Sequence, residues 1–301
     1  MSDQVLLETP PDVWTNRTYA GRGYPRVRAF TRHRLALFGA IVILTLAIVA
    51  IFASFIAPYD PNAIDLFATA QAPSRAHLLG TDDIGRDVLS RVIYGTRVSL
   101  SVGLVSVTIY VVIGTILGSV SGYFGGWVDS TIQRITDAVM CFPSLIIIVA
   151  AVAIIGPSIY NVMIVIGLLT WPGICRLVRG QILTLREREF VEAARAIGAP
   201  PWKVIFSHLL PNTVAPITVA ATFGVAAAIL TEAGLSFLGL GVQPPTPSWG
   251  NLINTAQSAA VLQQMPWLWV PAGVMIALAV LSINFIGDGL RDALDPRFTH
   301  R

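Results

Sequence analysis

Six apolar stretches, each about as long as a membrane-crossing helix, constrain this chain more than any other feature. A helix needs about 20 apolar residues to cross the hydrocarbon core of a bilayer. The first two stretches contain no charged residue at all. We therefore predict an all-α membrane protein with six transmembrane helices, over residues 35–57, 98–122, 135–155, 159–178, 213–233 and 267–287.

The overall composition supports a membrane protein. Of the 301 residues, 54% are hydrophobic and only 12% are charged, whereas soluble domains carry about 25% charged residues. Cys141 and Cys175 lie in or beside predicted spans, and two cysteines are too few for a disulfide framework. We expect them to be packing residues. The first 34 residues are polar, and the apolar run that follows is too long for the core of a cleavable signal peptide.

The basic residues indicate which side of the membrane each loop occupies. If the N-terminus is inside, sixteen of the 20 Lys and Arg residues lie in inside segments. The outside segments hold only Arg75, Arg86, Arg91 and Arg97, and the loop over residues 235–266 holds none. Because cytoplasmic loops are enriched in Lys and Arg, we predict that both termini and the segment over residues 184–211 are cytoplasmic.

That cytoplasmic segment predicts two short amphipathic helices joined by a turn. Thr184 and Glu187 have the spacing of a capping box, which favours a helix start there. Gly198 provides a left-handed stop, Pro200 and Pro201 prevent continuation, and Pro201 is suited to the first position of the next helix. Two apolar faces follow from helical spacing, Phe190, Val191, Ala194 and Ile197 in the first helix and Trp202, Ile205, Phe206 and Leu209 in the second.

The same segment resembles the EAA loop of ABC importer permease subunits. Glu-Ala-Ala is followed after three residues by Gly, and then by Leu-Pro at the spacing of that family, although His208 stands where the family has Ile. The resemblance implies a helical hairpin that docks on a cytoplasmic ATPase. An ordinary amphipathic surface hairpin is the alternative. The coupling residues implied by the resemblance are Glu192, Ala193, Ala194, Gly198, Leu210 and Pro211.

A second informative segment lies outside the membrane, before the second span. In residues 77–100, Asp82 or Asp83 is positioned to cap a helix, and apolar residues alternate with charges. We expect a helix that lies on the outer membrane surface, either as an amphipathic anchor or in contact with a ligand. Its apolar stripe consists of Val88, Leu89, Val92 and Ile93.

This outer segment narrows the family. The string GTDDIGRDVLSR at residues 80–91 is similar to the GTD-x-x-GRD-x-x-SR signature of the C-type permease of dipeptide, oligopeptide and nickel ABC importers. Residues 232–253, where Ser248 is expected to cap a helix over residues 250–260, and residues 287–297 resemble the same subfamily. The resemblance implies the type I ABC importer permease fold with an extra N-terminal span.

Four regions follow from this resemblance. They are a cytoplasmic tail over residues 1–34, the first span with an extracytoplasmic segment over 35–96, the permease domain over 97–288, and a cytoplasmic tail over 289–301. The implied location is the bacterial inner membrane, in contact with lipid. The implied partners are a sister permease, two ATPase subunits that bind ATP and Mg, and an extracytoplasmic binding protein, with no nucleic acid. Short peptides are the expected substrate, and nickel or a glutathione-like molecule is the alternative.

Catalytic motifs are missing from the sequence. The sole lysine, Lys203, lies between Trp202 and Val204, so the chain has no P-loop, and it has neither HExxH nor GxSxG. The four histidines are scattered. We therefore expect no catalytic residue, no cofactor and no metal site in this chain. An intramembrane enzyme would need a nucleophile–base pair, and a self-sufficient secondary carrier a relay of acids within the spans; neither is visible.

Two acidic residues at membrane depth are candidates for the transport path or a gate. Asp137 follows Arg134 by one helical turn, so a local ion pair is the alternative role. Glu232 lies at the outer end of the fifth predicted span, facing either a gate or water. Small residues at four-residue spacing also predict close helix packing in two spans. These are Gly114, Gly118 and Gly122 in the second span, and Ala220, Gly224 and Ala228 in the fifth.

Overall fold

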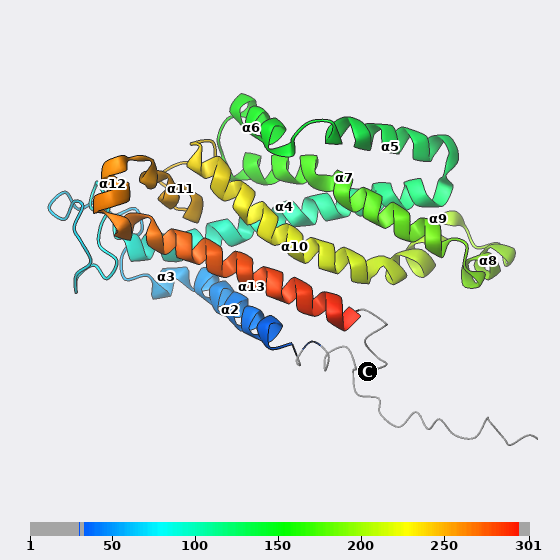
Figure 1. The fold of residues 1–301 in the computed structure, drawn as a ribbon, viewed down its shortest axis with the longest axis horizontal. Helices are drawn as coiled ribbons and strands as arrows, with labels where there is room; N and C mark the ends of the chain where they lie inside the picture. Colours follow the sequence, from blue (N-terminus) through cyan, green and yellow to red (C-terminus); the bar gives the residue numbers. More distant parts are fainter. Residues whose placement is uncertain (1–29, 31–32, 295–301) are drawn as a thin grey trace, which may run out of the picture.

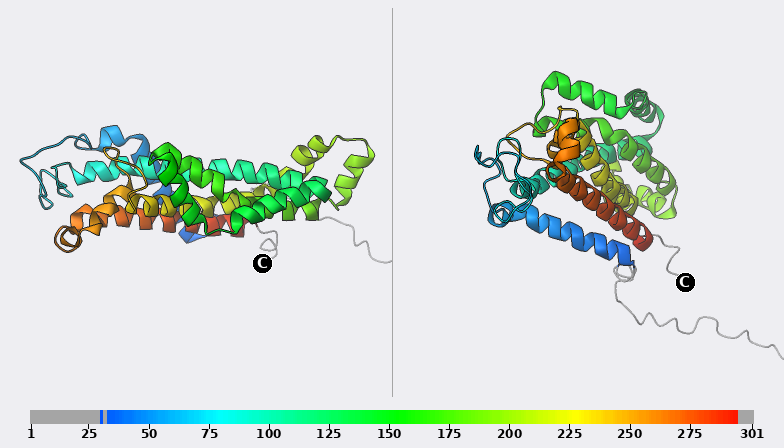
Figure 2. Two further views of the ribbon diagram at one scale, coloured as in Figure 1. Left: turned by 90° about the horizontal axis from the view of Figure 1, so that it is seen from above. Right: turned by 60° about the vertical axis from the view of Figure 1, so that its left-hand side comes forward.

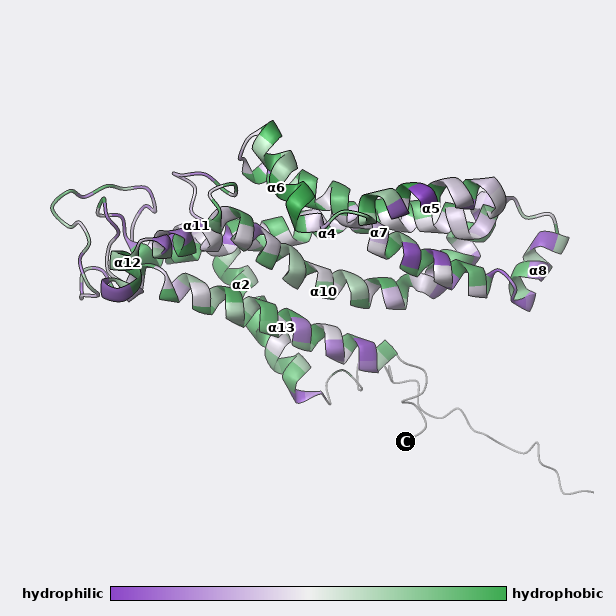
Figure 3. Ribbon diagram, turned by 45° about the horizontal axis from the view of Figure 1, so that its top comes forward, coloured by the Kyte–Doolittle hydropathy of each residue, from purple (hydrophilic) through white to green (hydrophobic). Residues whose placement is uncertain are grey.

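The computed structural model describes residue 30 and residues 33–294. Nearly all of the predicted N-terminal tail, and residues 295–301 of the predicted C-terminal tail, lie outside the described part. Within it, long helices run side by side in an elongated bundle (Figure 1). Hydrophobic residues dominate the middle of the bundle, and hydrophilic residues gather toward its two ends, around α8 and α12 (Figure 3). This distribution fits a bundle that crosses a membrane along its long axis.

Five helices in this part of the chain are long and apolar enough to cross a membrane. α2 with the short helix α3 forms the first span, and its position confirms the prediction for residues 35–57. The later spans extend beyond their predicted ends, because the helices continue through polar residues that flank the apolar runs. The bounds are α2 Arg34–Ile51, α3 Ala53–Ile56, α4 Val88–Phe124, α7 Ile159–Leu185, α10 Leu210–Phe237 and α13 Val270–Leu294.

The third predicted span is not one helix. It consists of α5 (Gly126–Met140) and α6 (Ser144–Ile155), which are bent by 81° at the break between them. Pro143 lies at this break; proline lacks a backbone N–H and disfavours helical geometry in the residue before it. The prediction of a continuous helix over residues 135–155 is therefore wrong: the bent pair is either a broken span or a re-entrant loop.

The helix expected on the outer surface is also not separate. It forms the first turns of α4 and continues directly into the second span. Its N-cap is Asp87 rather than Asp82 or Asp83, with the carboxylate accepting a hydrogen bond of 2.8 Å from Ser90 N. Its apolar stripe faces the protein interior, because Val88 and Val92 pack in a buried cluster with Trp249. The prediction of a surface anchor is therefore wrong.

The glycine stripe of α4 allows α7 to pack closely against it. A Cβ atom added to Gly118 would lie 2.5 Å from the carbonyl oxygen of Cys175, and one added to Gly122 would lie 2.9 Å from Ile182 Cβ. On α10, a Cβ atom at Gly224 would overlap with the Tyr110 hydroxyl. The predicted close packing is confirmed, and both partners belong to this chain.

Short helices close the end of the bundle that lies opposite α8 (Figure 2). Ser248 caps α11 (Trp249–Asn254), as predicted, and the structure adds a capping box with Asn251. The predicted helix over residues 250–260 is interrupted, however, because the backbone turns extended at Ser258. At the side of the bundle, α2 packs against α13, and α13 packs against α10. The remaining elements at this end are η2 Thr255–Gln257, α12 Ala259–Gln264 and η3 Pro266–Leu268.

Candidate functional site

The Glu-Ala-Ala segment forms a short helix, α8 (Glu189–Ala196), at one extreme end of the bundle (Figure 1). Gly198 ends it in the left-handed region, at φ +77°. The N–H of Ala199 bonds to the carbonyl of Ala194 at 3.1 Å, and that of Gly198 to the carbonyl of Arg195 at 2.9 Å. This pair of bonds is the Schellman helix stop. The predicted role of Gly198 in the turn is confirmed.

The two helices around this turn differ from the prediction in their limits. Thr184 lies within α7, and its hydroxyl donates to the Gly180 carbonyl at 3.1 Å, so no helix begins there. After the turn, Pro201 begins α9 (Pro201–Lys203), as predicted. This helix does not stop. It continues through the π-helical turn η1 (Val204–Leu209) into α10. The second arm of the hairpin is therefore the inner end of a transmembrane helix.

The predicted apolar faces divide into a buried part and an exposed part. Val191, Ala194, Val204, Ile205 and Leu209 are buried in the main core and fix the hairpin to the bundle. By contrast, Ile197 is 85% exposed and Trp202 is 65% exposed, with Phe190 and Phe206 also exposed. The prediction of one continuous apolar face on each helix is therefore wrong, because each set contains both buried and exposed residues. The exposed members form an apolar tip on the hairpin, which sequence reasoning missed.

The six expected coupling residues lie together on this hairpin, but they do not share one environment. Glu192, Ala193, Gly198 and Pro211 are exposed, Leu210 is half-buried and Ala194 is buried. Ala194 therefore holds the hairpin in place and does not reach its surface. The guanidinium of Arg195 lies 5.0 Å from the centre of the Tyr123 ring and connects α8 to the end of α4.

At the opposite end of the bundle, the GTD-x-x-GRD-x-x-SR segment folds back on itself. The Asp82 carboxylate accepts hydrogen bonds from Arg86 N at 2.9 Å and from Arg86 Nε at 2.6 Å. Gly85 has φ +83°, and a Cβ atom there would overlap with the Asp65 carbonyl. The Asp87 carboxylate accepts from Ser90 Oγ at 2.7 Å. The motif residues thus build a compact outer loop that leads into α4.

Glu232 lies in the last turns of α10 and is fully buried. Its carboxyl group accepts hydrogen bonds from the hydroxyls of Ser236 at 2.7 Å, Ser248 at 3.0 Å and Ser99 at 3.4 Å. Each of these hydroxyls in turn accepts a backbone N–H. Of the two alternatives for Glu232, facing water is therefore wrong, because Ser248 at the start of α11 bonds to it within the protein; a gate role stays a prediction.

Asp137 pairs with Arg176 of the neighbouring helix α7, not with Arg134. The local pairing fails because α5 runs beside α7, which brings the Arg176 guanidinium to the carboxylate. Both side chains remain largely exposed, Asp137 at 60% and Arg176 at 47%. A second pair, missed from the sequence, joins the same helices. The Arg179 guanidinium donates two bonds to the Asp129 carboxylate, at 2.7 and 2.6 Å.

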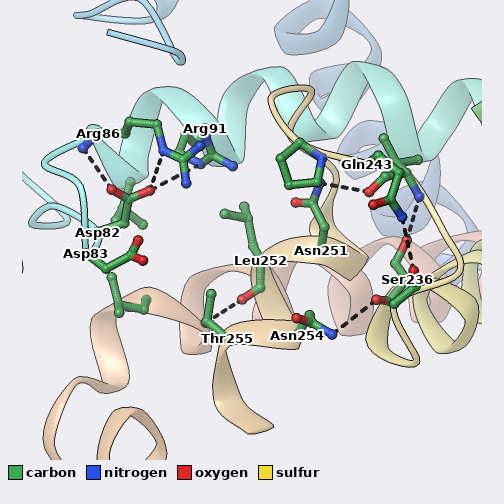
Figure 4. A pocket seen from close by; sticks show the side chains of 15 residues that line it. Asp82, Asp83, Arg86, Arg91, Ser236, Gln243, Asn251, Leu252, Asn254 and Thr255 are labelled. Atoms are coloured by element: carbon green, nitrogen blue, oxygen red, sulfur yellow. Dashed lines mark hydrogen bonds and ion pairs between the residues drawn. The ribbon is translucent and has the colours of Figure 1, made fainter. Parts of the chain in front are cut away.

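A cavity of about 350 Å³ lies between the outer segments (Figure 4). Charged residues of the GTD-x-x-GRD-x-x-SR segment line one end of it, and polar residues from α10, α11 and the loop between them line the other. Within residues 30 and 33–294, no three His, Cys, Asp or Glu side chains come together as metal ligands. The polar residues of the cavity wall are Asp82, Asp83, Arg86, Arg91, Ser236, Gln243, Asn251, Asn254 and Thr255.

Comparison with solved structures identifies the fold. The chain aligns with a chain of the MetNI methionine ABC transporter, solved in an inward-facing conformation, with a TM-score of 0.53 and 19% identity. The alignment covers 68% of this chain and 97% of the transporter chain. At this identity the likeness shows the fold, which is that of a type I ABC importer permease.

Sequence comparison then gives the family. Residues 114–300 match the binding-protein-dependent transport system inner membrane component family, and residues 26–73 match the N-terminal transmembrane domain of oligopeptide transport permease C. This chain belongs to the family of binding-protein-dependent transport system inner membrane components. It is therefore a multi-pass inner-membrane permease component, and works in a complex with ATPase and binding-protein partners.

Two relatives cover nearly the whole chain. The dipeptide transport system permease protein DppC of Alkalihalophilus pseudofirmus is 45% identical over 266 residues, which are 88% of this chain and 87% of the relative. The glutathione transport system permease protein GsiD of Escherichia coli is 44% identical over 271 residues, which are 90% of this chain and 89% of the relative.

Proposed function

We propose that this chain forms, with a sister permease, the membrane path of an importer for short peptides delivered by an extracytoplasmic binding protein. The observation that supports the peptide substrate is the similarity to relatives named for dipeptide and for glutathione, which is itself a tripeptide. A metal path is the weaker alternative, because the described residues bring no cluster of metal ligands together.

The hairpin around Gly198 is the proposed coupling element. Its apolar tip, formed by Phe190, Ile197, Trp202 and Phe206, is suited to a hydrophobic cleft on an ATPase, with Glu192 beside it to pair with a basic residue. Exposed apolar residues gathered on a small protruding element are typical of protein docking sites. The tip lies at the end of the bundle that the arginine distribution predicts to be cytoplasmic.

Movement of this hairpin would pass directly into the membrane helices. On one side, α9, η1 and α10 are continuous, so displacement of the tip acts along α10. On the other, α8 is fixed by the buried side chains of Val191 and Ala194 and by the contact of Arg195 with Tyr123. When ATP closes the ATPase dimer, the docked hairpins would move with it and the two half-bundles would rock between outward and inward access.

In the proposed importer the ATPase subunits bind ATP and Mg, and this chain contributes no catalytic group. Both termini lie in the cytoplasm in this arrangement. The test is affinity purification of the tagged chain from bacterial membranes in mild detergent, followed by reconstitution in vesicles. We expect a sister permease and ATPase subunits to co-purify, and uptake of labelled dialanine to require ATP and the binding protein.

Parallel uptake assays with glutathione and with Ni²⁺ separate the alternative substrates. Uptake of dialanine that exceeds both supports the peptide assignment, and uptake of Ni²⁺ alone overturns it. Transport by the isolated chain, without ATPase subunits, would instead indicate a secondary carrier.

A further inference from the structure

The turn between α5 and α6 leaves part of the backbone without hydrogen bonds. The N–H of Cys141 still donates to the Asp137 carbonyl at 2.9 Å, but α6 begins only after Pro143. No backbone N–H of the described chain donates to the carbonyl oxygens of residues 138–142. The three residues at the turn, Cys141, Phe142 and Pro143, are all exposed. In a membrane, such a turn lies in a protein contact or beside a water-filled cavity, and not in lipid.

Contacts between helices place this turn at the depth of the bilayer core. The Thr136 hydroxyl of α5 lies 4.0 Å from the Cys175 sulfur of α7. A Cβ atom added to Gly118 of α4 would lie 2.5 Å from the carbonyl oxygen of the same Cys175. Gly118 lies four residues, or about 6 Å, within the apolar run that ends at Gly122. Because α5 leads away from the α8 end of the bundle toward α6 (Figure 1), the turn lies deeper than Thr136.

One side of α5 is polar along its whole length. Ser130, Arg134, Asp137 and Cys141 recur at intervals of three and four residues, so they share one side of the helix, and all four are exposed. The ion pair of Asp137 with Arg176 turns this polar side toward α7. Charged side chains within membrane spans face protein or a water-filled cavity. The polar side of α5 is therefore unsuited to lipid contact.

Two glycines of α7 continue the same surface. Gly173, Arg176 and Gly180 are spaced by three and four residues, so they lie on one side of α7. A Cβ atom added to Gly173 or to Gly180 would meet no atom within 4 Å. By contrast, one added to Gly167 of the same helix would lie 2.6 Å from Ile109 Cγ2. The side of α7 next to Arg176 is therefore open in this chain.

We propose that the polar side of α5, the turn after it and the open side of α7 line a water-filled section of the transport path. Water there would bind the free carbonyl groups of residues 138–142 and hydrate the ion pair of Asp137 with Arg176. The sister permease would enclose the section from the other side. A dry contact with that permease is the competing arrangement, because it too would exclude lipid. The proposal rests on the permease function above and adds the residues of this chain that face the passing peptide.

The native thiol of Cys141 lies on this surface and reports on it without a substitution there. The complete importer in lipid nanodiscs is treated with a charged, water-soluble maleimide, and modification of this chain is followed by mass spectrometry. Because the reactive thiolate forms in water, Cys141 in the Cys175→Ala variant should react at least about tenfold faster than the control thiol. The control is Ile135→Cys, made with Cys141→Ser and Cys175→Ala. Ile135 is 53% exposed, but it lies on the apolar side of α5.

A second thiol and a trapped state distinguish the path from other wet surfaces. Gly173→Cys, made with Cys141→Ser and Cys175→Ala, should react as fast as Cys141, because its side chain enters open space. Trapping of the ATPase subunits with ATP and vanadate should change both rates several-fold, since alternating access opens and closes the path.

Three results decide the proposal. If Cys141 reacts no faster than Ile135→Cys, the surface is a dry contact and the proposal is overturned. If Cys141 reacts quickly but its rate is the same in the trapped state, the surface is wet but lies outside the path, which also overturns it. Dialanine uptake by the same importer in vesicles is measured in parallel. ATP-dependent uptake together with either of these results means that only the assigned lining fails and the permease function stands.

Discussion

The Ser248 hydroxyl donates a hydrogen bond of 3.0 Å to the Glu232 carboxyl group, and this bond joins the outer helix α11 to the span α10. The same hydroxyl accepts the Asn251 N–H at 3.1 Å and so also caps α11. Ser99 extends the connection to α4, because its hydroxyl donates to Glu232 and accepts the Trp249 N–H at 3.2 Å. One buried carboxyl group therefore organises three helices at the outer end.

Removal of this carboxyl group should destabilise the protein strongly. Glu232→Ala leaves three buried hydroxyls without an acceptor and creates a cavity, so we expect a loss of about 3 kcal/mol. Glu232→Gln keeps one acceptor oxygen and the side-chain volume, so its loss should be about 1 kcal/mol. The thermal unfolding midpoint of the purified complex measures both. Thr231→Ala is the matched control, because its hydroxyl bonds only to Ala227 O of its own helix. Equal midpoints for Glu232→Ala and Thr231→Ala would contradict this role.

The close packing of α4 against α7 should depend on the absence of a side chain at Gly118. A methyl group there would lie 2.5 Å from the Cys175 carbonyl oxygen, and neither backbone can yield easily. Gly118→Ala should therefore cost about 2 kcal/mol. Gly234→Ala is the control, because its added Cβ atom meets nothing within 4 Å and alanine favours the helix by up to about 1 kcal/mol. The yield of folded protein and its melting temperature should fall only for Gly118→Ala.

The pairing of Asp137 with Arg176 gives a test based on charge balance. Both side chains are about half exposed, so we expect the pair to contribute up to about 1 kcal/mol. Asp137→Asn and Arg176→Gln should each lower the yield of inserted complex, and the double substitution should restore much of it. Arg134→Gln should have little effect, because Arg134 makes no ion pair in the described structure. If the yield of the double variant falls by as much as the losses of the two single variants combined, the pairing is disproved.

The spans were predictable because an apolar run of sufficient length has few other uses. The breaks and extensions of these helices were not predictable, because the hydropathy of a segment gives the length of its apolar run and not the direction of the helix axis. Apolar residues on both sides of Pro143 hid the bend between α5 and α6. Likewise, the charges of Arg86 and Asp87 suggested a surface helix, whereas both side chains are satisfied within the outer loop and α4 begins there.

Local chemistry also separates what could be predicted of the site from what could not. The stop at Gly198 and the cap at Ser248 depend on neighbouring residues, and both were predicted. The contacts of Glu232 depend on Ser99, which is 133 residues away, and the pair of Asp137 depends on a residue 39 positions later. Such partners follow from helix packing, which one sequence does not reveal.

Substitutions at Gly198 separate docking from folding. Its left-handed backbone disfavours most side chains, but Asn and Asp tolerate this region best, and no atom lies within 4 Å of an added Cβ. Gly198→Asn and Gly198→Asp should therefore fold and insert alike. They differ in charge beside the exposed Ile197, at the proposed contact with the ATPase. Because an unpaired charge buried in an interface costs several kcal/mol, Gly198→Asp should lower dipeptide uptake by roughly tenfold or more, while Gly198→Asn keeps most of it. Uptake and ATPase co-purification, measured on the same preparations, check this. If Gly198→Asp retains both at the level of Gly198→Asn, the hairpin is not the coupling element.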